Sequence, residues 1–170
     1  DLLKDAGKDV IAVGKIFDIF DGEGVTEKIK TTGNTNGIAF TKALQTRDFE
    51  GLAFVNLVDF DMLYGHRRDV AGYAAAATEF DKFVADFIPG MREGDILMVT
   101  ADHGCDPSYT KTTDHTREYV PYLICGNGVK PGVDLGTKLC FGTIAQTICD
   151  YLGVDASTLD GQSVLGDILA

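Results

Sequence analysis

Short apolar runs recur along the chain and are separated by segments with helical periodicity. The runs are rich in valine, isoleucine and leucine and cover residues 10–14, 53–58, 96–100 and 120–124. Continuous apolar runs of this length are typical of strands that are buried on both faces of a mostly parallel sheet. Pro121 near the start of the last run is compatible with the first residues of a strand or with an edge strand.

The clearest helical pattern follows Asp69, a residue type suited to cap a helix N-terminus. Its apolar face is made of Val70, Tyr73, Ala77, Phe80, Val84 and Phe87. Pro89 and Gly90 end this helix, and two more are predicted at about 36–45 and about 141–151. Because strands and helices alternate, we expect one α/β domain over residues 1–170, with a mostly parallel sheet flanked by helices.

The composition excludes several classes of protein. With 15 Lys+Arg against 26 Asp+Glu, the formal net charge is −11, and the hydrophobic fraction of 45% is that of a globular protein rather than a disordered one. A strongly acidic chain predicts no nucleic-acid or anionic-membrane partner, and no run approaches the roughly 18 apolar residues that span a bilayer. The four cysteines form no C-x-x-C pair, which favours reduced, mostly buried thiols in a cytoplasmic protein.

All three histidines lie in short segments shared with aspartate. Segment 59–66 follows the second predicted strand, segment 100–104 ends the third, and segment 113–117 lies in the loop before the fourth. The carboxyl ends of parallel strands meet at the edge of a sheet where α/β proteins bind ligands. Carboxylate and imidazole ligands suit Mn²⁺ or Zn²⁺ better than Mg²⁺, so the pattern predicts a metal site with one or two ions.

A purely structural role for these residues is the alternative. An aspartate at a strand end is often a turn former or a helix N-cap, and a lone histidine is more often a hydrogen-bonded structural residue than a ligand. Because every histidine of the chain shares a short segment with an aspartate, and two of the three segments come just after strands, the metal site is favoured over a non-catalytic α/β domain.

Three strings resemble those of phosphopentomutases, a family of alkaline-phosphatase-like metalloenzymes. They are NLVDFDMLYGHRRD at 56–69, TADHGCDP at 100–107 and TDHTREYVP at 113–121. The resemblance implies an alkaline-phosphatase-like core and an isomerase of nucleoside salvage. Such an enzyme interconverts (deoxy)ribose 1-phosphate and (deoxy)ribose 5-phosphate through a phosphothreonine enzyme and a bisphosphate intermediate.

The resemblance also assigns ligands residue by residue. It makes Asp61, His66 and His115 the ligands of one metal ion, and Asp102 and His103 ligands of a second. Two divalent ions are thus implied as cofactors, with Mn²⁺ as the expected metal.

Lys15 matches a lysine that contacts the sugar-phosphate substrate in the family. By the same resemblance, the phosphorylated threonine and a further aspartate ligand come from an N-terminal core segment, which a cap domain follows. We therefore expect this chain to be the C-terminal part of the core, to lack the nucleophile and to show no mutase turnover by itself. The alternatives within the superfamily are a metal-dependent phosphatase or phosphodiesterase and a phosphoglycerate-mutase-like enzyme.

Overall fold

A three-stranded parallel sheet is the centre of the computed structural model, which describes residues 1–169. Its order is β2–β1–β3, with β1 at Asp9–Val13, β2 at Glu27–Ile29 and β3 at Gly51–Val55. Ile11 of β1 lies opposite Glu27 on one side and Ala53 on the other. The last four residues of β1 are buried, as expected for a central strand with both faces covered.

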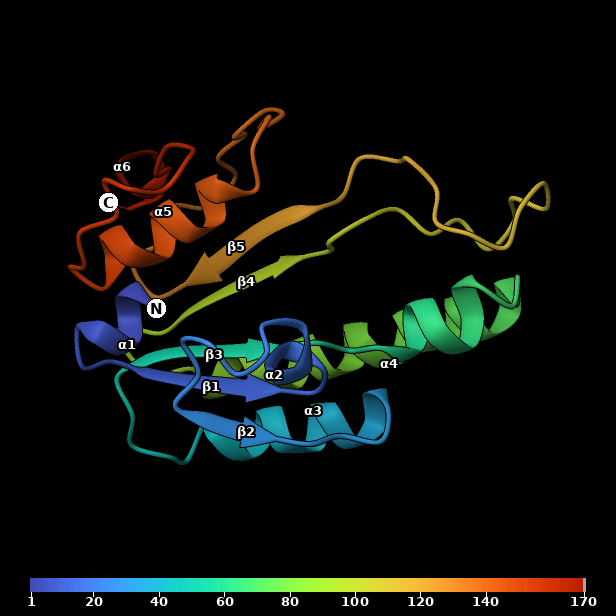
Figure 1. Ribbon diagram of the computed structural model, residues 1–170, viewed down its shortest axis with the longest axis horizontal. Coiled ribbons are helices and arrows are strands. Elements are labelled where there is room, and N and C mark those ends of the chain that lie inside the picture. The colour runs from blue at the N-terminus through green and yellow to red at the C-terminus, as the bar shows by residue number, and fades with distance from the viewer. Residues whose placement is uncertain (170) are drawn as a thin grey trace.

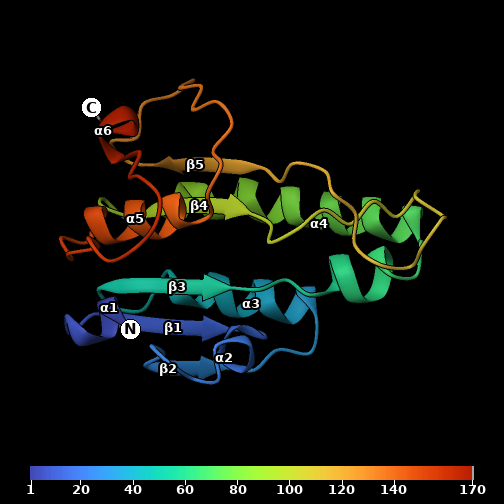
Figure 2. The same ribbon diagram turned by 45° about the horizontal axis from the view of Figure 1, so that its top comes forward.

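β4 (Ile96–Thr100) and β5 (Tyr122–Gly126) form a separate antiparallel pair. Figure 2 shows this pair beside the three-stranded sheet, with β4 nearest to β3. The α/β class is confirmed, but β5 runs against the other strands. The reason is its connection: residues 101–121 contain no helix that could carry the chain across the sheet, and this long loop extends away and returns (Figure 1).

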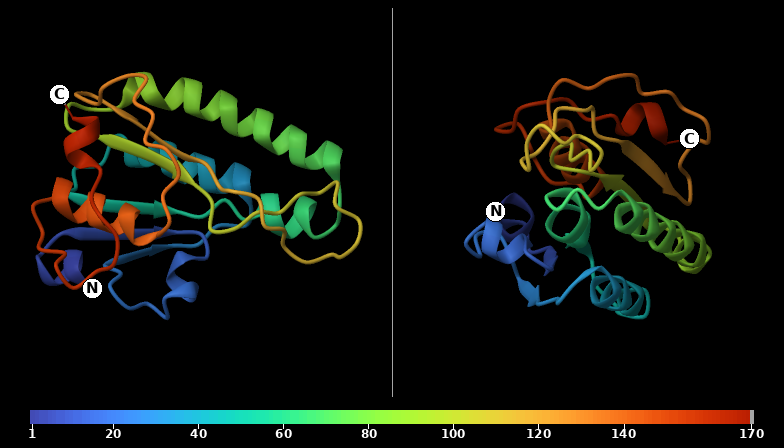
Figure 3. Two further views of the ribbon diagram at one scale, coloured as in Figure 1. Left: turned by 90° about the horizontal axis from the view of Figure 1, so that it is seen from above. Right: turned by 90° about the vertical axis from the view of Figure 1, so that its right-hand side faces the viewer.

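Helices cover both sides of the strands (Figure 3). The three predicted helices are confirmed as α3 (Asn34–Leu44), α4 (Val70–Phe87) and α5 (Gly142–Tyr151). α3 and α4 lie on one side, and α5 lies on the other with the short helices α1 (Leu2–Asp5) and α2 (Ile16–Ile19). The short helix α6 (Leu165–Ile168) follows α5. Asp69 caps α4 as predicted, because its Oδ1 accepts a hydrogen bond from the backbone N–H of Gly72 at 2.9 Å.

The core forms on the two faces of β1. Ile11 and Val13 pack with Leu44 of α3, whereas Val10 packs with Cys149 of α5. All four cysteines are free thiols, but only Cys149 is fully buried and Cys140 is exposed. The prediction of mostly buried thiols is therefore wrong: Cys105 and Cys125 are only partly buried, and Cys140 lies in a loop before α5 rather than in an apolar element. Among the described residues, no helix has the length and apolar character needed to cross a membrane.

We expect Ile11→Ala to lower the free energy of unfolding by about 2–5 kcal/mol, since it opens a cavity in the central strand. Ile11 is 1% exposed, whereas Ile19 of α2 is 59% exposed. Ile19→Ala is the matched control and is expected to change stability by no more than about 0.5 kcal/mol. Urea unfolding followed by circular dichroism measures both, and equal effects would contradict this placement of the core.

Candidate metal centre

A π-helix positions the first two site residues. The helix η1 (Phe60–Gly65) follows β3, and the backbone N–H of His66 donates to the carbonyl of Asp61 at 3.0 Å. A hydrogen bond between residues five apart is the mark of a π-helix, which is rare and often found at functional sites. It places Asp61 and His66 on the same side of the helix, one above the other.

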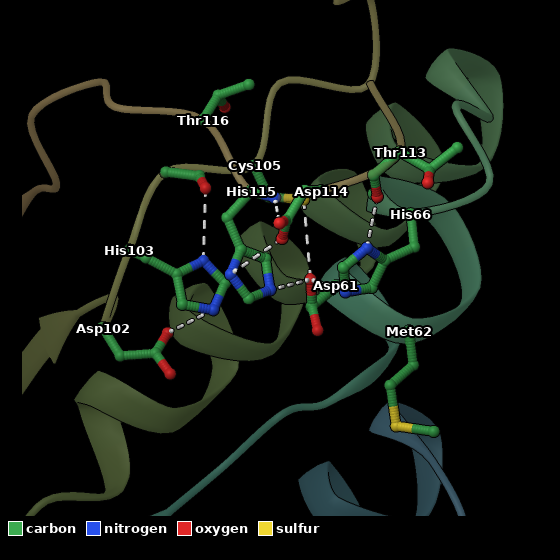
Figure 4. A network of polar contacts seen from close by, with 12 residues as sticks. Asp61, Met62, His66, Asp102, His103, Cys105, Thr113, Asp114, His115 and Thr116 are labelled. Atoms are coloured by element: carbon green, nitrogen blue, oxygen red, sulfur yellow. Dashed lines mark hydrogen bonds and ion pairs between the residues drawn. The ribbon is translucent and has the colours of Figure 1, made fainter.

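His115 completes a cluster of three residues. Asp61, His66 and His115 each offer a ligand atom, and these atoms lie within 4.8 Å of one another. The Nε2 atoms of His66 and His115 lie 3.2 Å and 3.5 Å from the same oxygen, Oδ1 of Asp61 (Figure 4). Two imidazole nitrogens and a carboxylate oxygen directed at one point are a donor set that fits a divalent transition metal.

A backbone carbonyl orients the ring of His66. Its Nδ1 lies 2.5 Å from the carbonyl oxygen of Thr113. Because that oxygen can only accept, Nδ1 must carry the proton, and in the neutral ring Nε2 keeps its lone pair on the side of Asp61. Metal-binding histidines are commonly held in this way by a hydrogen bond from the second ring nitrogen.

Asp102 and His103 lie beside this cluster but outside it. The His103 ring stacks on His115 with centroids 3.7 Å apart, and Oδ1 of Asp102 lies 3.6 Å from Nε2 of His103. The Asp102 side chain is 76% exposed. Within residues 1–169 these two side chains form no second cluster of three ligands.

Lys15 follows a sharp turn at the end of β1. Gly14 has φ +85°, and a Cβ there would lie 2.6 Å from the carbonyl oxygen of Asn56, so the turn requires glycine. Lys15 itself is exposed, and its Nζ lies 2.6 Å from Sδ of Met62 in η1. Its ammonium group is thus beside the element that carries Asp61.

Two other aspartates have structural partners. Asp59 and Asn34 exchange hydrogen bonds, since each side-chain oxygen accepts from the other backbone N–H, at 2.7 Å and 2.9 Å. This pair joins the start of η1 to α3. Asp114 accepts from the backbone N–H of His115 at 2.8 Å, and this hydrogen bond lowers the pKa of the Asp114 carboxyl.

The sequence did not single out two further residues next to the cluster. Sγ of Cys105 lies 3.5 Å from Oδ1 of Asp61, and burial, with help from that carboxylate, raises the pKa of the Cys105 thiol. Arg68 donates hydrogen bonds to backbone carbonyls of three segments around the site, at Gly65, at Asp106 and at residues 112–114. Arg68 lies in one of the family-like strings, but neither its spacing nor its residue type distinguishes it from Arg67.

A parallel sheet with helices on both sides, and with aspartate and histidine gathered beyond its carboxyl edge, is the architecture of a metal-dependent enzyme domain. Residues 5–156 match the family described as the Metalloenzyme superfamily. The chain belongs to this family.

Among the curated proteins, phosphopentomutases are similar over nearly the whole chain. The protein of Acetivibrio thermocellus is 53% identical over 163 residues, which are 96% of this chain and 42% of that protein. The protein of Clostridioides difficile is 49% identical over 168 residues, or 99% and 43% of the two chains. The resemblance to phosphopentomutases is thus confirmed, and the chain spans about two fifths of the length of these relatives.

A solved structure supports the fold. The chain is similar to Leishmania mexicana phosphoglycerate mutase, crystallised at low cobalt concentration, with a TM-score of 0.70. The match covers 95% of this chain and 38% of that one at 18% identity. At that identity the likeness concerns the fold alone.

Proposed function

We propose that this chain is the metal-binding part of a phosphopentomutase. The enzyme would be an isomerase of nucleoside salvage in the cytoplasm that interconverts the 1-phosphate and 5-phosphate of ribose or deoxyribose. One observation carries the proposal: Asp61, His66 and His115 converge on one point in a chain about half identical to proteins named phosphopentomutase.

Under this proposal Asp61, His66 and His115 hold one Mn²⁺ ion, and Asp102 and His103 contribute to a second site. Two such ions supply positive charge that stabilises a transferring phosphoryl group. The chain has a net charge of −11, and a sugar phosphate is an anion, so local positive charge is needed at the site.

The protein residues have distinct roles in this proposal. Thr113 keeps the His66 ring turned toward Asp61 through the hydrogen bond at Nδ1. Lys15 is exposed beside η1, where its ammonium group would bind the phosphate of the substrate. The phosphorylated threonine and the cap domain would come from the part of the protein that corresponds to the rest of its relatives' length.

A chimera tests the proposal. The residues of the Acetivibrio thermocellus phosphopentomutase that lie outside the matched region would be joined to this chain, in the order of that relative. With Mn²⁺ and ribose 1-phosphate, the chimera is expected to form ribose 5-phosphate, and the 170-residue chain by itself is expected to form none.

The same assay separates the alternatives. Release of inorganic phosphate without isomerised sugar phosphate would favour a phosphatase, and an inactive chimera that binds Mn²⁺ would contradict the mutase. Robust mutase turnover by the 170-residue chain would show that no further segment is needed.

A further inference from the structure

The Arg68 guanidinium makes an unusual set of hydrogen bonds in the turn between η1 and α4. It forms five hydrogen bonds of 2.5–3.0 Å, and every acceptor is a backbone carbonyl. Nε and Nη2 both donate to Thr112, Nη2 also donates to Asp114, and Nη1 donates to Gly65 and Asp106. An arginine side chain has five N–H groups, so its capacity as a donor is fully used.

These carbonyls belong to the three segments that carry the aspartate and histidine residues of the site. Gly65 ends η1, which holds Asp61 and precedes His66. Asp106 lies in the loop after β4, a few residues beyond His103. Thr112 and Asp114 lie in the segment before His115. One side chain therefore connects the backbones of all three segments, whatever side chains those segments carry.

Arg68 and His66 contact neighbouring backbone carbonyls in the segment before His115. The carbonyls of Thr112 and Asp114 accept from Arg68, and the carbonyl of Thr113 between them lies 2.5 Å from Nδ1 of His66. Three consecutive carbonyls directly before His115 are thus held by two side chains from the turn that follows η1. The approach of the His115 ring to Asp61 follows from this attachment.

The backbone of Arg68 adds an independent observation. Its φ is +55°, and within residues 1–169 Asp21 is the other non-glycine residue with positive φ. A left-handed conformation is costly for a long side chain, and glycine or asparagine would serve a simple turn better. Strain of this kind persists where the surrounding contacts enforce it, commonly near functional sites.

We propose that Arg68 is a positioning residue of the metal centre. It holds the loop that ends at His115 against η1, so that the three ligand side chains face one point before a metal ion arrives. The proposal rests on the metal site of the proposed function, and Arg68 itself contacts neither the ion nor the substrate.

Matched variants of the 170-residue chain test this role. Arg68→Met removes all five donors, and Arg68→Lys keeps the charge but loses the planar fork. Arg67→Met is the control, since the Arg67 side chain is exposed and makes no hydrogen bond or ion pair with residues 1–169. By titration calorimetry with Mn²⁺, both Arg68 variants should lose on the order of tenfold in affinity, and Arg67→Met should equal the wild type.

A double-mutant cycle distinguishes positioning from a general structural role. If Arg68 acts through His115, Arg68→Met should change Mn²⁺ affinity little once His115→Ala is present. Additive losses, or unchanged affinity in Arg68→Met, would overturn the proposal. Circular dichroism checks that each variant folds. If Arg68→Met does not fold, the same cycle is measured with Arg68→Lys in its place.

Amide hydrogen exchange in the metal-free chain keeps the two proposals separate. The backbone N–H of Thr116 donates to Gly104, and that of Asp106 donates to the Thr116 hydroxyl. Both amides should exchange faster in Arg68→Met than in Arg67→Met, and equal rates would reject the role of Arg68. If the wild type binds no Mn²⁺, the proposed function fails, but this comparison still decides whether Arg68 holds the loop.

Discussion

Asp61→Asn is expected to weaken Mn²⁺ binding to the chain by at least about 100-fold. Loss of a residue that merely supports a metal ligand costs roughly 10- to 100-fold in affinity. Asp61 is expected to be a ligand itself, so its loss should cost at least as much. Its Oδ1 is the one atom that both His66 and His115 face, at 3.2 Å and 3.5 Å. Asparagine keeps the shape but removes the negative charge that a divalent cation requires. Titration calorimetry with Mn²⁺ measures the effect.

Asp81→Asn is the matched control for this substitution. It makes the same chemical change on α4, where the Asp81 side chain is exposed and makes no hydrogen bond or ion pair with the described residues. Mn²⁺ should raise the unfolding temperature of the wild type and of Asp81→Asn, because a ligand that binds only the folded state stabilises it. The same shift in Asp61→Asn would place the metal elsewhere and favour a structural role for the aspartate and histidine residues.

The strands and long helices of the fold were predictable because their apolar patterns are strong. β1 and β4 each contain four consecutive apolar residues, and α4 has both an N-cap and an apolar face. β2 was not predicted, since Glu27–Ile29 has three residues and two of them are charged. The antiparallel direction of β5 was not predicted either, because it depends on the path of the long loop before it.

The site was predictable in its residue types and only partly in its geometry. Asp61, His66 and His115, which the resemblance assigns to one metal ion, lie close together, and their role as ligands stays a prediction. The π-helix that aligns Asp61 with His66 has no simple sequence pattern, because it depends on backbone hydrogen bonds between residues five apart. Arg68 was not predicted for a related reason: its acceptors are backbone carbonyls, which every residue type possesses.

Asp102→Asn is expected to lower mutase turnover of the chimera by at least about 100-fold. A metal ion stabilises the charge of the transition state by several kcal/mol, and each loss of about 1.4 kcal/mol lowers the rate tenfold. The affinity of the first Mn²⁺ site should change little. The reason is geometric: the Asp102 carboxylate pairs with His103 at 3.6 Å and lies outside the cluster of Asp61, His66 and His115. A side chain that is 76% exposed contributes little to folding, and under the proposed function its carboxylate would bind a second ion.

A loss of turnover without a loss of first-site Mn²⁺ affinity distinguishes a role of Asp102 in a second site from general disruption of the metal centre. Asp81→Asn, which removes the same charge from an exposed helix position, should keep full turnover in the chimera. If Asp102→Asn lowers turnover and first-site affinity together, Asp102 acts on the first site, through the His103 ring that stacks on His115. Unchanged turnover in Asp102→Asn would remove Asp102 from the catalytic machinery and leave a centre with one metal ion.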